Sequence, residues 1–212
     1  MRLKVLKMSW SEYEKWSFSI IKDVLAHLQF LLYCILFGIN KKTLEIGSGT
    51  GLQSCFVSYF GIEVISIDRD ARVAKMASNV SRYYNSKDVS FVVADARYLP
   101  FREKTFGLSF SQGLLEHLDN KTIVEIVSEA EYAVNGKILF SVPSVNFPEQ
   151  DFGNERLLYP WQWKSILAPF NAQASYYRFD FQSFKNSIVK GKIPKPWHIQ
   201  IDISTKSLGV NL

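Results

Sequence analysis

The pattern of apolar and polar positions predicts strands and helices that alternate along most of the chain. Five short runs rich in apolar and β-branched residues are typical of buried strands, at 43–46, 63–67, 90–94, 105–111 and 137–142. Three intervening segments repeat apolar residues at helical spacing, at 52–60, 71–84 and 121–134. Alternating strands and helices favour an α/β fold with a mostly parallel sheet and helices on both of its faces.

The two ends of the chain depart from this alternation. Residues 28–39 are nearly all apolar, but this run of about 12 residues is shorter than the ~20 that span a bilayer. We expect it to pack on the sheet as the end of a helix that begins near Ser11; contact with a membrane surface, or a lid over a substrate, is the alternative. After a helix from Pro160, residues 174–184 and 197–205 alternate like two paired strands.

The strand at 43–46 leads directly into glycines at positions 47, 49 and 51. A strand, a glycine-rich turn and a helix in this order form a cradle for a nucleotide, because glycine adopts backbone angles closed to other residues and lets a ligand approach closely. The dinucleotide fingerprint G-x-G-x-x-G requires a third glycine at position 52, which is Leu52. A nicotinamide dehydrogenase is therefore disfavoured, and a second βαβ half is also missing.

The string Glu45 to Gly51, E-x-G-x-G-x-G, resembles motif I of the class I S-adenosylmethionine-dependent methyltransferases. Two later strings fit the same family: ADARYLPF at 94–101 resembles G-D-A-x-x-L-P-F, and the segment ending in Leu115-Glu116-His117-Leu118 resembles the small-molecule branch of type-11-like domains. The resemblance covers about residues 41–142. It implies a Rossmann-like, doubly wound sheet of seven strands with an antiparallel last strand.

The same resemblance implies transfer of a methyl group from S-adenosylmethionine, with S-adenosylhomocysteine as product, to a small-molecule acceptor whose identity stays open. Residues 1–40 are expected to form an N-terminal helical cap, and 41–212 the methyltransferase domain. The alternative is a catalytically silent, methyltransferase-like binding module that acts as a partner or regulatory protein. The residues implied as cofactor-binding are Glu45, Gly47, Ser48, Gly49, Gly51, Asp68, Arg69, Asp95, Ala96, Ser111 and Gln112.

Within this set, the two aspartates follow the second and third strands. Asp68 ends the second strand and is expected to hold the ribose hydroxyls, while Asp70 caps the next helix. Asp95 is expected to receive the adenine amino group, with Arg69 beside the ring. Two positions depart from the family: Ala94 replaces a glycine, and Gly107 replaces an acid, which puts the local strand geometry in question.

Candidates for the chemistry are fewer. His117 is the best titratable group for a general base, and a structural histidine is the alternative. Gly113 stands where the metal-binding E-x-x-E-H cluster has its first glutamate, so we expect no metal. The loop 144–158 precedes a helix and is expected to roof the acceptor pocket together with the apolar run 28–39. The expected substrate residues are Phe147 and Arg156 in this loop and Tyr159 directly after it. Aromatic side chains with one arginine suit a small acceptor that carries an anionic group. The alternative is that Arg156 pairs with a surface acid.

The distribution of charge bears on the binding partners, and the cysteines bear on the cellular compartment. The net charge of +5 gathers at the two ends and leaves residues 8–184 with a net charge of about −2, so a nucleic-acid platform is disfavoured. The basic ends keep contact with a membrane surface open, and the oligomeric state is open. Cys34 and Cys55 have no metal-type spacing, and Met1 to Met8 lack a secretory pattern. We expect a cytoplasmic protein with reduced thiols.

Overall fold

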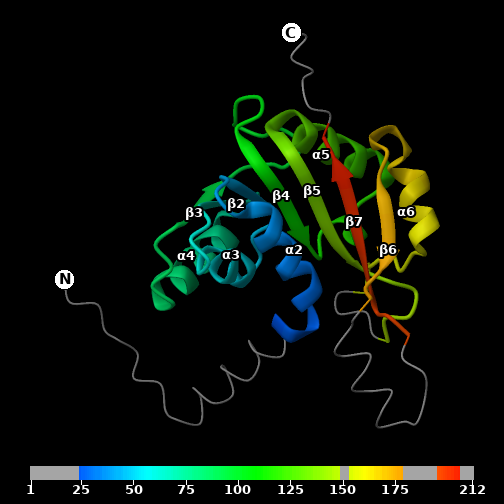
Figure 1. Cartoon of the computed structure of the whole chain (residues 1–212), viewed down its shortest axis with the longest axis horizontal. Helices are drawn as coiled ribbons and strands as arrows, with labels where there is room; N and C mark the ends of the chain where they lie inside the picture. The colour runs from blue at the N-terminus through cyan, green and yellow to red at the C-terminus, as the bar shows by residue number, and fades with distance from the viewer. Residues whose placement is uncertain (1–23, 149–152, 179–194, 206–212) are drawn as a thin grey trace, which may run out of the picture.

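A computed structural model describes residues 24–148, 153–178 and 195–205, and these form one seven-stranded sheet flanked by helices (Figure 1). The strand order is β3-β2-β1-β4-β5-β7-β6, and only β7 runs antiparallel to its neighbours. The predicted doubly wound sheet with an antiparallel last strand is confirmed. The strands are β1 (Thr43–Ile46), β2 (Val64–Asp68), β3 (Val89–Val93), β4 (Phe106–Gln112), β5 (Val134–Pro143), β6 (Gln173–Tyr176) and β7 (His198–Ser204).

The helices cover both faces of the sheet, as the alternation predicted. One hydrophobic cluster joins the sheet to α5 and α6, and a second joins it to α2 and α3. Asp70 caps α4 by accepting a hydrogen bond from the Arg72 backbone N–H, as expected. The helical elements are α2 (Leu28–Gly38), α3 (Leu52–Ser58), α4 (Ala71–Tyr83), α5 (Asn120–Ala133), α6 (Pro160–Ile166) and two short 3₁₀ helices, η1 (Leu115–His117) and η2 (Ala168–Phe170).

The apolar run at 28–39 forms α2 and packs on the sheet. Phe30, Leu31 and Cys34 are fully buried, whereas Leu32 and Leu36 lie on the exposed side. Among the described residues, no helix has the length and apolarity needed to cross a bilayer. The expected helix start at Ser11 lies outside the described residues, as does the part of the predicted strand 174–184 beyond residue 178.

The junction between α5 and β5 differs from the prediction. The predicted helix 121–134 and strand 137–142 left Asn135 and Gly136 between them, but α5 passes directly into β5 at Val134 and both residues lie in the strand. The register between β4 and β5 shifts here, next to Gly107. A Cβ on Gly136 would collide with the Gly107 carbonyl oxygen. The glycine therefore permits close approach of two strands, not a turn.

Candidate active site

The glycine turn between β1 and α3 has the geometry that its sequence predicted. Gly47, Gly49 and Gly51 have φ angles of 81°, 46° and 76°, in the left-handed region that favours glycine. A Cβ on Gly51 would lie 2.8 Å from the Ala77 Cβ and 2.9 Å from the Phe91 ring. The turn therefore packs closely against α4 and β3 at Gly51. In the described part of the chain, nothing lies within 4 Å of a Cβ built on Gly49. The turn thus presents open backbone toward a ligand.

A cavity of about 340 Å³ lies beside this turn, at the carboxyl ends of β1, β2 and β3; we call it the glycine-turn cavity. Five of the residues predicted to bind the cofactor line it together, although they come from three separate segments. The fold thus unites motif I with the acids that follow the second and third strands. These five are Gly47, Asp68, Arg69, Asp95 and Ala96.

The two aspartates in this cavity are held by local hydrogen bonds. Asp68 accepts one from the Asp70 backbone N–H at 3.0 Å through Oδ1. Asp95 binds the Arg97 guanidinium through Nε at 3.1 Å and Nη2 at 2.6 Å, and also accepts from the Arg97 backbone N–H. The Arg97 side chain lowers the pKa of Asp95 to about 2. Both carboxylates therefore reach the cavity in a fixed orientation, and Asp95 is charged at any physiological pH.

Other predicted cofactor residues lie beneath the turn, outside either cavity. Glu45 is 3% exposed and accepts hydrogen bonds from the hydroxyls of Ser54 and Ser66, both at 2.5 Å. Burial raises its pKa to about 7. Ser111 donates to the Ile46 carbonyl at 2.6 Å. The side chains of Glu45 and Ser111 therefore support the turn, whereas Ser48 belongs to the turn itself and is buried there.

A second cavity, of about 150 Å³, lies next to the first at the carboxyl ends of β4 and β5; we call it the histidine cavity. All three histidines of the chain line it, and His117 lines the glycine-turn cavity as well. The predicted cofactor residue Gln112 lies here, where it accepts a hydrogen bond from Gln53 at 2.6 Å. The lining residues are His27, Gln112, Gly113, Glu116, His117, Ser141, Val142, Pro143, Phe147, Glu155 and His198.

Glu116 is the most unusual group in the histidine cavity. It is 3% exposed, and its Oε2 has no hydrogen-bond partner among the described residues. Burial raises its pKa to about 8, and the nearby charge of Glu155 acts in the same direction. A buried carboxyl without a partner is costly, which makes it a candidate for binding a ligand. No group of three or more metal-ligating side chains occurs in the described ranges.

His117 has a defined orientation between the two cavities. Its Nδ1 lies 2.8 Å from the Asn154 Oδ1. An amide oxygen only accepts hydrogen bonds, so Nδ1 carries the proton and Nε2 carries the lone pair of the neutral ring. The predicted base candidate therefore lies where the two cavities meet.

The three predicted substrate residues are separated in the structure. Phe147 lines the histidine cavity, with its ring centroid 5.5 Å from that of His198. Arg156 lines neither cavity, because its guanidinium donates to the Leu118 carbonyl at 2.6 Å and to the Asn120 Oδ1 at 2.7 Å. Tyr159 precedes α6 and stacks on Trp161.

The sequence assigned no site role to five polar side chains of the histidine cavity: His27, Glu116, Ser141, Glu155 and His198. Two of them flank the ends of secondary structure elements, since His27 precedes α2 and His198 begins β7. No spacing connects them in the sequence. The only signal was that histidine is rare in this chain.

The chain is similar to known methyltransferases. A family model described as a methyltransferase domain matches residues 44–134. The chloroplastic tocopherol O-methyltransferase of Arabidopsis thaliana is 32% identical over 127 residues, which are 58% of this chain and 35% of that protein. The chain thus spans about a third of the length of this relative.

Two solved structures share the fold at low identity. An S-adenosylmethionine-dependent methyltransferase from Aquifex aeolicus superposes with a TM-score of 0.67 at 13% identity, covering 89% of this chain and 97% of that one. Magnesium protoporphyrin IX methyltransferase from Synechocystis, solved with bound S-adenosylmethionine, gives 0.63 at 11%, covering 88% and 84%.

The described residues of the glycine-turn cavity fit S-adenosylmethionine by their chemistry. An open glycine turn gives the backbone access to a ligand, and one carboxylate follows each of the two neighbouring strands. Residues 44–134 thus resemble a methyltransferase domain, and the whole described sheet has the fold of the solved methyltransferases to which it is similar.

Proposed function

We propose that this protein transfers a methyl group from S-adenosylmethionine to a small molecule, with the donor in the glycine-turn cavity and the acceptor in the histidine cavity. The observation that carries the proposal is that the two cavities meet at His117. Five of the residues expected to bind the donor line one cavity, and the other encloses a volume suited to a small acceptor. This division lets the two reactants approach each other from opposite sides.

Individual residues have distinct parts in donor binding. Asp68, at the tip of β2, would bind the ribose hydroxyls through its carboxylate, and Asp95 with the Ala96 backbone would bind the adenine edge. Arg69 would lie beside the ring. Glu45 and Ser111 would act indirectly, since they hold the turn through Ser54, Ser66 and the Ile46 carbonyl.

The chemistry needs little from the protein beyond alignment. When bound, S-adenosylmethionine supplies an electrophilic methyl group on a sulfonium, and the leaving thioether is neutral. No residue must protonate the leaving group, so proximity and exclusion of water carry most of the rate. Where the accepting atom must lose a proton, the Nε2 lone pair of His117 would receive it.

The two cysteines bear on the cellular compartment of the protein. Cys34 and Cys55 are free and buried, which suits a reducing environment. We place the protein in the cytoplasm on this basis.

Titration calorimetry with S-adenosylmethionine tests the function directly. The Asp68→Ala variant should lose roughly 10- to 100-fold in affinity, because a hydrogen bond to a charged group contributes about 1.5–3 kcal/mol. Asp70→Ala is the matched control: it removes the cap of α4, outside the cavity, and should lower thermal stability while leaving affinity within about twofold. If the parent protein binds no S-adenosylmethionine, or Asp68→Ala binds it equally well, the donor site is elsewhere.

A further inference from the structure

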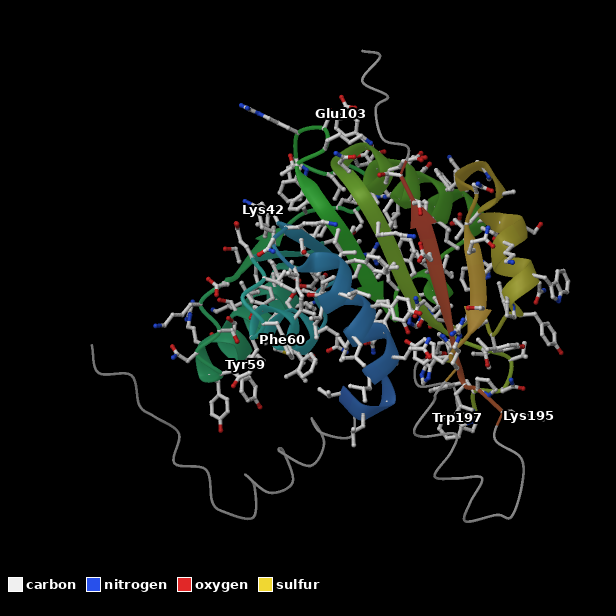
Figure 2. The ribbon with its side chains drawn as sticks, viewed as in Figure 1. Lys42, Tyr59, Phe60, Glu103, Lys195 and Trp197 are labelled. Carbon is white, nitrogen blue, oxygen red and sulfur yellow. The ribbon has the colours of Figure 1, made fainter. Side chains whose placement is uncertain are left out.

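The described lining of the histidine cavity contains carboxyl and imidazole groups. Among the described residues that line it, none is a lysine or an arginine. Arg156 follows Glu155 in sequence, yet its guanidinium is bound to the Leu118 carbonyl and Asn120. Lys195 lies at the periphery of the molecule beside Trp197 (Figure 2) and does not line the cavity. An anionic acceptor, which the sequence had suggested, would therefore meet two glutamates and, in the part of the lining that the structure describes, no lysine or arginine.

The buried carboxyl of Glu116 requires a hydrogen-bond donor. It is 97% buried, lines the cavity and leaves Oε2 without a partner in the described structure. Such an atom has lost its hydrogen bonds to water without a replacement, and a ligand that donates to it recovers this cost. A protonated amine is the strongest small donor, because it supplies several N–H groups and the opposite charge.

Resting on the proposed function, we propose that the methyl acceptor is a small amine, bound as an ammonium ion against the Glu116 carboxylate in the histidine cavity. Phe147 gives the cavity one aromatic wall, so the rest of the acceptor is partly apolar. Glu116 here is a binding residue that touches the substrate. His117, at the boundary with the donor cavity, receives the proton that must leave before methylation.

The step balances in atoms and charge. The ammonium R–NH₃⁺ passes one proton to Nε2 of His117, which leaves a neutral amine with a lone pair. That lone pair forms the new N–C bond to the methyl carbon, and the electron pair of the breaking S–C bond goes to sulfur. The products are the N-methylammonium ion, neutral S-adenosylhomocysteine and protonated His117, which later returns its proton to water.

Amine binding should depend on pH in a defined direction. The groups that face Glu116 across the cavity are Glu155, His27, His117 and His198. With a pKa of about 8, Glu116 is neutral near pH 7 in the absence of a ligand, whereas an ammonium ligand favours its ionised form. Affinity therefore rises from about pH 6 to 8 and falls only when the free amine itself loses its proton, roughly near pH 9–10.

Calorimetry on the full chain with three isosteric probes tests the proposal: benzylamine, benzyl alcohol and benzoate. At pH 8, benzylamine should bind roughly tenfold or more tightly than either of the others, and Glu116→Gln should remove most of this preference and its rise with pH. Glu125→Gln, which changes a surface glutamate paired with Lys121, should leave both intact. S-adenosylhomocysteine titrated into each variant should bind with unchanged affinity, which also shows that the variant is folded.

Three outcomes would overturn the proposal: benzylamine fails to bind, benzoate or the alcohol binds as well, or Glu116→Gln binds benzylamine like the parent. Each is separate from the fate of the proposed function. Loss of the donor site would appear in the S-adenosylmethionine titration of the parent protein, whereas the amine titrations report only on the histidine cavity.

Discussion

The two cavities hold carboxyl groups in opposite electrostatic situations. In the glycine-turn cavity, Asp95 is partly exposed and paired with Arg97, which keeps its pKa near 2. In the histidine cavity, Glu116 is buried, its described neighbours in the lining include no lysine or arginine, and burial raises its pKa to about 8. The first carboxylate is charged at neutral pH. The second is neutral until a ligand or a higher pH ionises it, so the two cavities should respond differently to mutation and to pH.

The largest effect is expected at the glycine turn. Gly51→Ala should lower the free energy of unfolding by about 2–4 kcal/mol, because the new methyl meets Ala77 and Phe91 at a positive φ. Gly49→Ala, with a similar backbone angle but open space, should cost only about 1 kcal/mol. Urea denaturation of both variants measures the difference. Equal losses would mean that α4 and β3 do not constrain the turn.

The next largest effect is a difference between Glu116 and Asp95 in how the stability of the protein depends on pH. The pKa of Glu116 is higher in the folded protein than in the unfolded chain, where it is about 4.5, so folding takes up a proton. Stability therefore falls as pH rises from about 4.5 to 8. Glu116→Gln should remove part of this fall and stabilise the protein at pH 8 by about 1–3 kcal/mol, with little change near pH 5.

The matched control for this prediction is Asp95→Asn. The pKa of Asp95 is lowered in the folded protein, so its contribution to stability is complete above about pH 4 and is lost only as the pH falls toward 2. Its stability difference from the parent should be the same at pH 6 and pH 8, in unfolding curves measured at both values. Glu45, whose pKa is raised to about 7, leaves some pH dependence of the same sign in the Glu116→Gln variant.

The smallest effect on stability is expected at Arg156, in the loop 144–158 before α6. Arg156→Ala should cost about 1 kcal/mol of stability, because it removes hydrogen bonds to the Leu118 carbonyl and Asn120. Arg156→Lys should restore only part of it, since lysine lacks the planar arrangement of donors. Thermal unfolding and S-adenosylmethionine titration together check this. A large loss of donor affinity with unchanged stability would instead give Arg156 a direct part in binding.

The glycine-turn cavity was predictable because its parts are local. Gly47, Gly49 and Gly51 are required by one turn, and Asp68 and Asp95 each follow a strand. Parallel strands place all their carboxyl ends at one edge of the sheet, so local order along the chain translates directly into a shared site. The sheet topology followed for the same reason, together with the alternating pattern of the last strands.

The histidine cavity was decided by tertiary structure. His27, Glu116 and His198 are far apart in sequence and come together only because β7 inserts antiparallel beside β5 and α2 packs near this edge. The same packing buries Glu116 and turns Arg156 toward the Leu118 carbonyl and the Asn120 side chain, which no spacing in the sequence indicates. A residue's type determines which bonds it can form, but desolvation and the competing partners around it determine its charge and its role, and both arise only when the chain is folded.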